Sequence, residues 1–200
     1  MSSIVISGDT SGTITIAAPA VAGTNTITLP AGTGTMTVAG VNSNIVSGTA
    51  VASTSGTAID FTGIPSWVKR ITVMLSGVSL SGGANYLLQL GAGSVTTSGY
   101  VGSGGYGYQS GSTVAVNTTT GFNIQVAGVS PAASTTHGVI IFTNVSGNIW
   151  VASGAGGYSA TAFWSSGGSV TLGGTLDRVR ITTSNGTDTF DAGSINILYE

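Results

Sequence analysis

The segment SGTITIAAPAVAGTNTITLPAGTGTMTV, residues 11–38, constrains the fold of this chain more than any other part of the sequence. Its aliphatic residues alternate with threonine or another small residue, which is the period of a β-strand with one apolar face. Turn residues such as Pro30 and Gly34 interrupt the alternation, and no charged residue protects the strand edges. The segment therefore predicts several short strands that need a partner.

Residues 1–40 together predict a β-rich anchoring and oligomerisation region. A segment of about 40 residues without a disulfide rarely buries enough surface to fold alone, and the chain has no cysteine. We expect the region to pair with copies of itself or with another protein. The predicted contact residues are the aliphatic ones of the alternating pattern: Ile14, Ile16, Ile27, Leu29, Met36 and Val38.

Composition excludes several classes of protein. Charged residues make up 5% of the chain, whereas about 25% is usual for a soluble domain. The hydrophobic fraction of 41% and the net charge of -2 exclude a disordered chain. Four cations are too few to cover a phosphate backbone, so no nucleic-acid partner is expected. The chain is predicted to be folded, rich in strands and dependent on packing or assembly.

The sequence also indicates where the chain is made. Its apolar runs, such as residues 139–142, are far shorter than the roughly 20 residues of a membrane-spanning helix. The first residues, MSSIVISGDTSG, lack the basic and apolar regions of a signal peptide. We therefore expect synthesis in the cytoplasm without a signal peptide, and no membrane insertion.

The remainder of the chain is predicted to form one sandwich. Residues 41–55 are rich in Ser, Gly and Ala and are interpreted as a linker. Residues 56–200 predict an antiparallel, jelly-roll-like β-sandwich, because about ten strand signals recur at sandwich spacing without helical periodicity. The predicted strands are 57–61, 68–75, 86–90, 113–116, 122–127, 138–143, 149–152, 160–164, 176–183 and 195–199. Gly-rich segments between them, including residues 102–107 and 167–168, are interpreted as loops or turns.

The cations lie in two similar segments, residues 68–72 and 178–182, where they alternate with aliphatic residues. The alternation places the cations on one face of a strand and the aliphatic side chains on the other. The cations are expected to meet Asp60, Asp177 or Glu200 of a neighbouring chain, or to be solvated. The four cations are Lys69, Arg70, Arg178 and Arg180.

No catalytic, cofactor-binding or metal-binding residue is predicted, and the chain is not expected to be an enzyme. His137 is the only histidine, and no G-x-S-x-G motif surrounds a serine. Residues 102–107 match G-x-G-x-x-G, but no strand and helix are expected on either side of them. Asp188 and Asp191 have two interpretations, Ca²⁺ ligands or turn residues that bind their own backbone.

Aromatic residues in Gly-rich sequence are the remaining candidates for a binding role. They could pack in the core or against another subunit, or their rings could stack on a glycan. In contrast, Trp67, Phe142 and Trp150 lie in or beside predicted strands and are expected in the core. The residues with the two interpretations are Tyr100, Tyr106, Tyr108 and Tyr158, together with Phe163 and Trp164.

Two parts of the chain resemble proteins of tailed bacteriophages. GDTSGTIT (8–15) and VAGTNTITLP (21–30) resemble a short module that recurs in phage structural proteins. DFTGIPSWVKRITV (60–73), LQLG (88–91) and FDAGSINILYE (190–200) resemble a module of phage and prophage virion or tail-fibre-like proteins. The resemblance implies a virion component, commonly a homotrimer, and marks no catalytic residue.

The size of the chain favours one position on the particle. A short N-terminal region before a single sandwich suits a capsid decoration, cement or head-fibre protein better than a tail fibre, which normally has a long shaft. The N-terminal strands would then bind the major capsid protein or another virion protein, and the sandwich would project from the particle surface. The alternative is a short tail fibre or receptor-binding adhesin that contacts a host-surface glycan.

Overall fold

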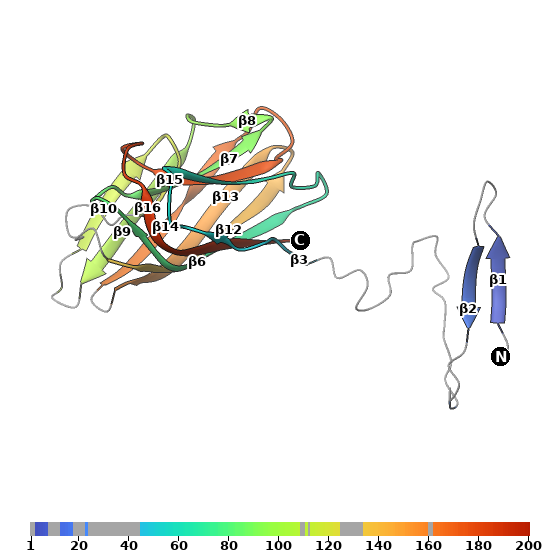
Figure 1. The fold of residues 1–200 in the computed structure, drawn as a ribbon. Helices are drawn as coiled ribbons and strands as arrows, with labels where there is room; N and C mark the ends of the chain where they lie inside the picture. Colours follow the sequence, from blue (N-terminus) through green and yellow to red (C-terminus); the bar gives the residue numbers. More distant parts are fainter. Residues whose placement is uncertain are drawn as a thin grey trace. The chain divides into compact units, whose positions relative to one another are not determined.

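The computed structural model describes residues 3–7, 13–17, 23, 45–108, 111, 113–124, 134–159 and 162–200. The chain divides into two compact units, Met1–Asn42 and Ser43–Glu200. In the first unit, β1 (Ser3–Ser7) pairs antiparallel with β2 (Thr13–Ala17), as Figure 1 shows. The strand predicted around residues 13–17 is therefore confirmed.

The described residues of the second unit form two antiparallel sheets. The larger, nine-stranded sheet runs in the order β10 (Thr113–Thr118), β9 (Val101–Tyr108), β14 (Ala162–Thr171), β13 (Ile149–Tyr158), β12 (Thr136–Ser146), β6 (Arg70–Leu80), β16 (Phe190–Tyr199) and β3 (Val46–Ser47), with β4 (Val51–Ala52) also paired to β16. The smaller, five-stranded sheet runs in the order β11 (Phe122–Ile124), β7 (Tyr86–Ala92), β15 (Arg178–Thr183) and β5 (Ala58–Thr62), with β8 (Ser94–Val95) paired to β7.

The two sheets bury one shared hydrophobic core. Along β15 and the first six residues of β6, every second residue faces this core. Ile71, Val73 and Ile181 are therefore fully buried, while the residues next to them are more exposed. Phe122 of the smaller sheet meets Phe142 of the larger sheet, with ring centroids 5.4 Å apart. Each such aliphatic or aromatic side chain contributes about 1.5–3 kcal/mol on burial. The predicted all-β fold with an antiparallel β-sandwich is confirmed.

The jelly-roll connectivity stays a prediction, and the strand order is compatible with it. From β4 to β7 the chain alternates between the larger and the smaller sheet, and it does so again from β14 to β16. Jelly rolls consist of two such sheets joined by repeated crossings. Four strands of the larger sheet, β9, β10, β13 and β14, extend it beyond β12.

The Gly-rich segments are where the structure departs most from the sequence prediction. Residues 102–107, predicted to be a loop, form most of β9, and Gly167 and Gly168, predicted to be a turn, lie inside β14. Both strands are formed because each has a full antiparallel partner on both sides. Glycine weakens a strand when no neighbour compensates, and here the neighbouring strands supply the backbone hydrogen bonds.

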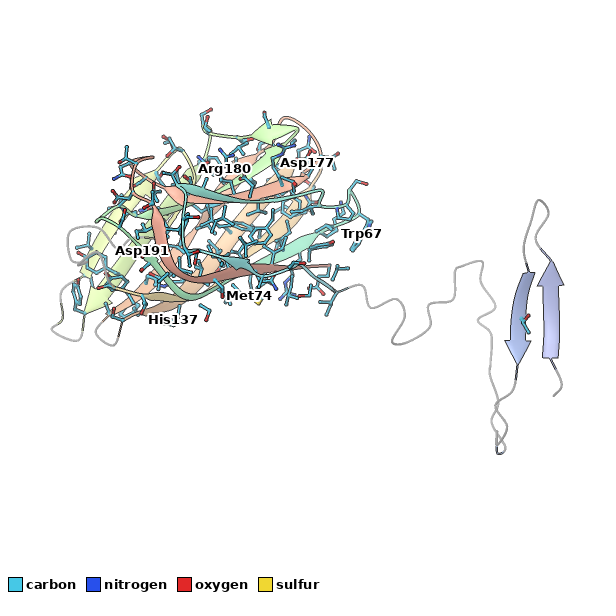
Figure 2. The ribbon with its side chains drawn as sticks, viewed as in Figure 1. Trp67, Met74, His137, Asp177, Arg180 and Asp191 are labelled. Carbon is cyan, nitrogen blue, oxygen red and sulfur yellow. The ribbon has the colours of Figure 1, made fainter. Side chains whose placement is uncertain are left out.

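Two further differences concern shorter segments. Within residues 45–55, predicted to belong to a linker, β3 and β4 pair with β16, so the backbone there is held by the sandwich. Trp67, expected in the core, is 49% exposed and lies at the periphery of the sandwich, where its ring is 6.0 Å from that of Tyr199 (Figure 2). Trp67 lies in a turn before β6, and the neighbouring residue Val68 is buried in the core instead. Phe142 and Trp150 are buried as expected.

Candidate functional site

The surface that stands out lies on the outer face, defined as the side of β9, β10, β13 and β14 that is turned away from the core. It contains an open groove of about 430 Å³. The groove forms because the residues of its floor have small side chains or none, so that the surrounding side chains rise above them. Its lining includes Ser103, Gly105, Ala115, Ser153, Ser165 and the ring of Phe163.

Strand register explains how this floor is built. Gly105 lies between Ala115 of β10 and Ser165 of β14, so three small residues are adjacent across three strands. A Cβ atom added at Gly105 would collide with the carbonyl oxygen of Val114. The glycine is therefore required for the close approach of β10 to β9, and the flat floor follows from that requirement.

Phe163 forms one wall of the groove and is the most accessible aromatic ring on the outer face. It lies opposite Gly107 of β9, and a Cβ atom added at Gly107 would be 2.5 Å from the Cε1 atom of the ring. The ring thus rests on bare glycine backbone while 58% of the residue remains exposed. An exposed ring held in this way can pack against another protein or stack on a sugar.

Trp164 packs in the same manner on the core side of β14. Its indole lies over Gly156 and Gly138, where an added Cβ atom would be 2.5 and 2.6 Å from ring carbons. The indole N–H donates to the carbonyl oxygen of His137 at 3.2 Å. Trp164 is fully buried, which agrees with the packing interpretation of this residue.

The four tyrosines proposed as partner or glycan contacts are placed differently from one another. Tyr100, Tyr106 and Tyr158 are buried, and Tyr108 is half-buried with its ring 5.2 Å from that of Tyr106. Burial leaves the three buried rings no open face for a sugar, because a stacked ligand needs one face of the ring exposed. Sequence reasoning could not see this, since glycines on both sides of a tyrosine suggested a loop.

Tyr100 shows what holds such a ring in place. Its hydroxyl accepts the N–H of Leu90 at 2.8 Å and lies 3.0 Å from the carbonyl oxygen of Thr96. The ring meets Phe122 edge to face, with centroids 5.1 Å apart. Burial raises the pKa of Tyr100 to about 12, although the hydrogen bond with Leu90 acts in the opposite direction. This tyrosine is a structural residue of the sandwich.

Of the residues predicted to contact the shell or another copy of the chain, two lie in described segments. Ile14 and Ile16 belong to β2 and pair with Ile6 and Ile4 of β1. Their role as contacts stays a prediction. The other four, Ile27, Leu29, Met36 and Val38, lie outside the described residues.

His137 lies on the exposed surface of β12, and its Nδ1 atom accepts the N–H of Gly77 at 3.1 Å. Figure 2 shows His137, Asp177 and Asp191 at three separate places on the sandwich. A nucleophile, a base and an orienting carboxylate must lie within hydrogen-bond reach of one another to act together. The contact observed for His137 is a hydrogen bond with the backbone of Gly77.

The carboxylates of Asp188 and Asp191 each accept a hydrogen bond from a residue that is distant in the sequence. The Asp188 carboxylate accepts the N–H of Ala84 at 2.9 Å, and its own backbone N–H donates to Asn185 Oδ1 at 3.0 Å. The Asp191 carboxylate accepts a hydrogen bond from the Ser79 hydroxyl. Within the described ranges, no three of His, Cys, Asp and Glu are grouped closely enough to hold a metal ion. The two carboxylates thus bind groups from other strands and turns and not their own backbone, and Asp191 lies inside β16, so the turn interpretation is wrong for these side chains.

The charged residues pair as the two cationic segments predicted. Arg180 forms a bidentate ion pair with Asp60, in which Nε and Nη2 each lie 2.7 Å from a carboxylate oxygen. Arg178 Nε lies 2.7 Å from Asp177 Oδ1. Arg70 meets Glu200 of its own chain at 2.9 Å, whereas Glu200 of a neighbouring chain was expected. The hydrogen bond from Arg178 lowers the pKa of Asp177. The pairs are largely exposed, so each contributes at most about 1 kcal/mol.

Charge is absent from a long internal part of the sequence. No Asp, Glu, Lys or Arg occurs from Ile71 to Leu176, a stretch that includes β9, β10, β13 and β14. The outer face therefore combines small side chains, hydroxyl groups and a few exposed apolar residues such as Phe163 and Val101. A surface of this kind is poorly protected against association, and its chemistry is that of a contact surface.

Comparison with known proteins gives no relative: no family model, no curated protein and no solved structure matches the chain. In the part of the chain that the structure describes, there is no helix that is long and apolar enough to cross a membrane.

Proposed function

We propose that the chain is a non-enzymatic structural protein of a tailed-bacteriophage particle, namely a trimeric capsid decoration or head-fibre protein on the virion surface. The resemblance of residues 8–30, 60–73 and 190–200 to phage structural modules motivates the proposal. The structural observation that supports it is the uncharged outer face of the sandwich, with its hollow floor and exposed Phe163. Such a surface suits contact with another protein surface.

In this proposal the two units have different tasks. Residues 1–40 bind the major capsid protein or another virion protein, and the sandwich of residues 56–200 is displayed outward. A decoration protein of this type stabilises the shell by mass action, because it binds the assembled shell and not the free subunits. Its binding energy comes from apolar burial and strand pairing, since few charges are present to attract the shell.

The proposal is tested with shells that lack the chain. Adding the purified full-length protein should raise the temperature at which the shells disassemble, and the effect should persist at high salt because apolar contacts are not screened. A steep loss of binding between low and high salt would contradict the proposed contact. Light scattering of the isolated chain should give three times its mass of 19.5 kDa, or a multiple of three chains where trimers associate further. A monomer would remove the basis for the trimer.

A short tail fibre or receptor-binding adhesin is the second candidate. It is favoured by one observation, the exposed Phe163 ring beside the hydroxyl groups of Ser103 and Ser165, because sugars are bound by rings and hydroxyls together. Copy number separates the two candidates. Hundreds of copies in each purified particle fit a shell protein, whereas a few dozen or fewer fit a fibre. For the adhesin, Phe163→Ala should lower attachment to host cells and leave particle stability unchanged.

A further inference from the structure

We infer that β10 is an association strand through which two copies of the chain pair antiparallel, centred on Ala115. β10 ends the nine-stranded sheet and pairs with β9 on one side. Among the described residues, no strand pairs with its other side. Along any strand, alternate N–H and C=O groups point to opposite sides, so β10 directs a row of them away from β9. A second strand offers hydrogen-bond partners to all N–H and C=O groups in such a row, whereas side chains can bind only some of them.

In the described part of the sandwich, the other sheet edges are protected, and β10 is not. β5 carries Asp60, which is held in the charged pair with Arg180, and a charge on an edge strand opposes pairing. β3, β4 and β8 have two residues each, and the three residues of β11 are all buried. In contrast, β10 has six residues, TVAVNT, with neither a charge nor a proline.

The sequence of β10 indicates that its partner is a second copy of the same strand. Around Ala115 the residues are nearly symmetric, so an antiparallel copy brings Val114 opposite Val116 and Thr113 opposite Asn117. Apolar residues then face apolar residues, and polar residues face polar ones, which is the arrangement that stabilises antiparallel pairs. The two Ala115 residues meet on the two-fold axis, where a small side chain prevents a clash.

The faces of the two sheets also match in this arrangement. Val114 lies opposite the buried Tyr106 in the register of β9 and β10, so the valines continue the core side of the sheet. Val114 is 38% exposed in the single chain, and pairing would cover it. Thr113, Ala115 and Asn117 continue the outer face. Because residues 71–176 hold no Asp, Glu, Lys or Arg, no like charges oppose the approach of the two copies.

This two-fold contact goes beyond the proposed trimer and does not depend on it. Residues 1–40 are the predicted anchoring and oligomerisation region, whereas the contact proposed here uses β10 of the sandwich. The two contacts use different parts of the chain, so the outcome for one does not determine the outcome for the other.

A cysteine on the two-fold axis tests the pairing directly in the full-length chain. The chain has no cysteine of its own, so Ala115→Cys introduces a single thiol. Residues directly opposite in an antiparallel pair have Cα atoms about 4.5–5.5 Å apart, within the range of about 4.4–6.8 Å that a disulfide spans. Val101→Cys is the matched control, because Val101 is 75% exposed and lies on β9, away from the edge.

Under mild oxidation, Ala115→Cys should form a disulfide-linked dimer about tenfold faster than Val101→Cys, because pairing raises the effective concentration of its thiol. The dimer is measured on a denaturing gel without reductant. Equal rates for the two variants would overturn the proposal. Faster cross-linking of Val101→Cys would also overturn it, because the outer face and not the edge would then be the contact.

A charge at the same position gives the complementary test. Ala115→Lys places two ammonium groups opposite each other and should weaken the association by about tenfold or more, whereas Val101→Lys should not. Light scattering at one protein concentration should show the native mass halved by Ala115→Lys. A three-chain mass unchanged by Ala115→Lys would overturn the two-fold contact and leave the proposed trimer intact. A two-chain mass reduced to one would support the contact and refute the trimer.

Discussion

Tyr100 is the residue for which the structure gives the clearest stability prediction. The change Tyr100→Phe keeps the ring that meets Phe122 edge to face and removes only the hydroxyl. The Leu90 N–H then loses its partner at 2.8 Å. The Leu90 carbonyl oxygen still accepts the N–H of Thr96 at 2.9 Å. Of the two backbone groups of Leu90, only its N–H therefore loses its hydrogen-bond partner.

The size of the effect follows from burial. Tyr100 is 2% exposed, so water cannot replace the hydroxyl without opening the core. A buried donor left without a partner costs about 1–3 kcal/mol in free energy of unfolding. For a chain of 150–250 residues, about 1 kcal/mol lowers the melting temperature by roughly 2–4 °C. A loss of about 2 kcal/mol therefore corresponds to about 4–8 °C.

The measurement is urea unfolding and calorimetry of Tyr100→Phe beside Tyr108→Phe. Tyr108 is half-buried, so its hydroxyl should matter little, and Tyr108→Phe should stay within about 0.5 kcal/mol of the native chain. If Tyr100→Phe is as stable as Tyr108→Phe, the Leu90 N–H does not depend on Tyr100. The structural role assigned to the buried tyrosine would then be incorrect.

Three further outcomes are expected. Burial raises the pKa of Tyr100 to about 12, whereas the pKa of an unfolded tyrosine is about 10. The contribution of Tyr100 to stability is therefore complete below pH ~10 and is lost as the pH rises to about 12. Over this pH window the free energy of unfolding should fall less in Tyr100→Phe than in the native chain. Gly156→Ala should destabilise the fold by about 1–3 kcal/mol, since its Cβ would meet the backbone carbonyl oxygen of His137 and the Trp164 ring. Gly157→Ala, where nothing lies within 4 Å, should be nearly neutral by thermal unfolding. A double-mutant cycle on Asp60 and Arg180 should give a coupling of at most about 1 kcal/mol that weakens with salt.

The sequence predicted best those strands in which aliphatic residues alternate with polar ones. β15 is an example, because Val179 and Ile181 repeat at the strand period and both are buried as that pattern requires. The pairing of Arg180 with Asp60 could also be anticipated, since the cations had to share one face of their strand. In these segments the local pattern contains the information that determines burial.

The Gly-rich strands could not be found in this way, because their strand structure depends on residues far away in sequence. β9 has an apolar pattern too weak to indicate a strand, and it exists because β10 and β14 pair with it on both sides. The outer-face groove was missed for the same reason. Its floor is a property of three adjacent strands, and no single segment of the sequence contains it. The one local signal was the presence of Tyr106 and Phe163 near glycines.

The packing of Phe163 on Gly107 has a consequence for how this sequence can diverge. A larger residue at position 107 would collide with the ring, and a smaller residue at position 163 would leave the glycine backbone uncovered. Each substitution alone is thus unfavourable, whereas the two together restore contact. In homologous chains the two positions should therefore covary, with a larger residue at 107 occurring only where 163 is small. Gly156, beside Trp164, should not covary in this way, because a Cβ atom there would also meet the backbone carbonyl oxygen of His137, whatever residue occupies position 164.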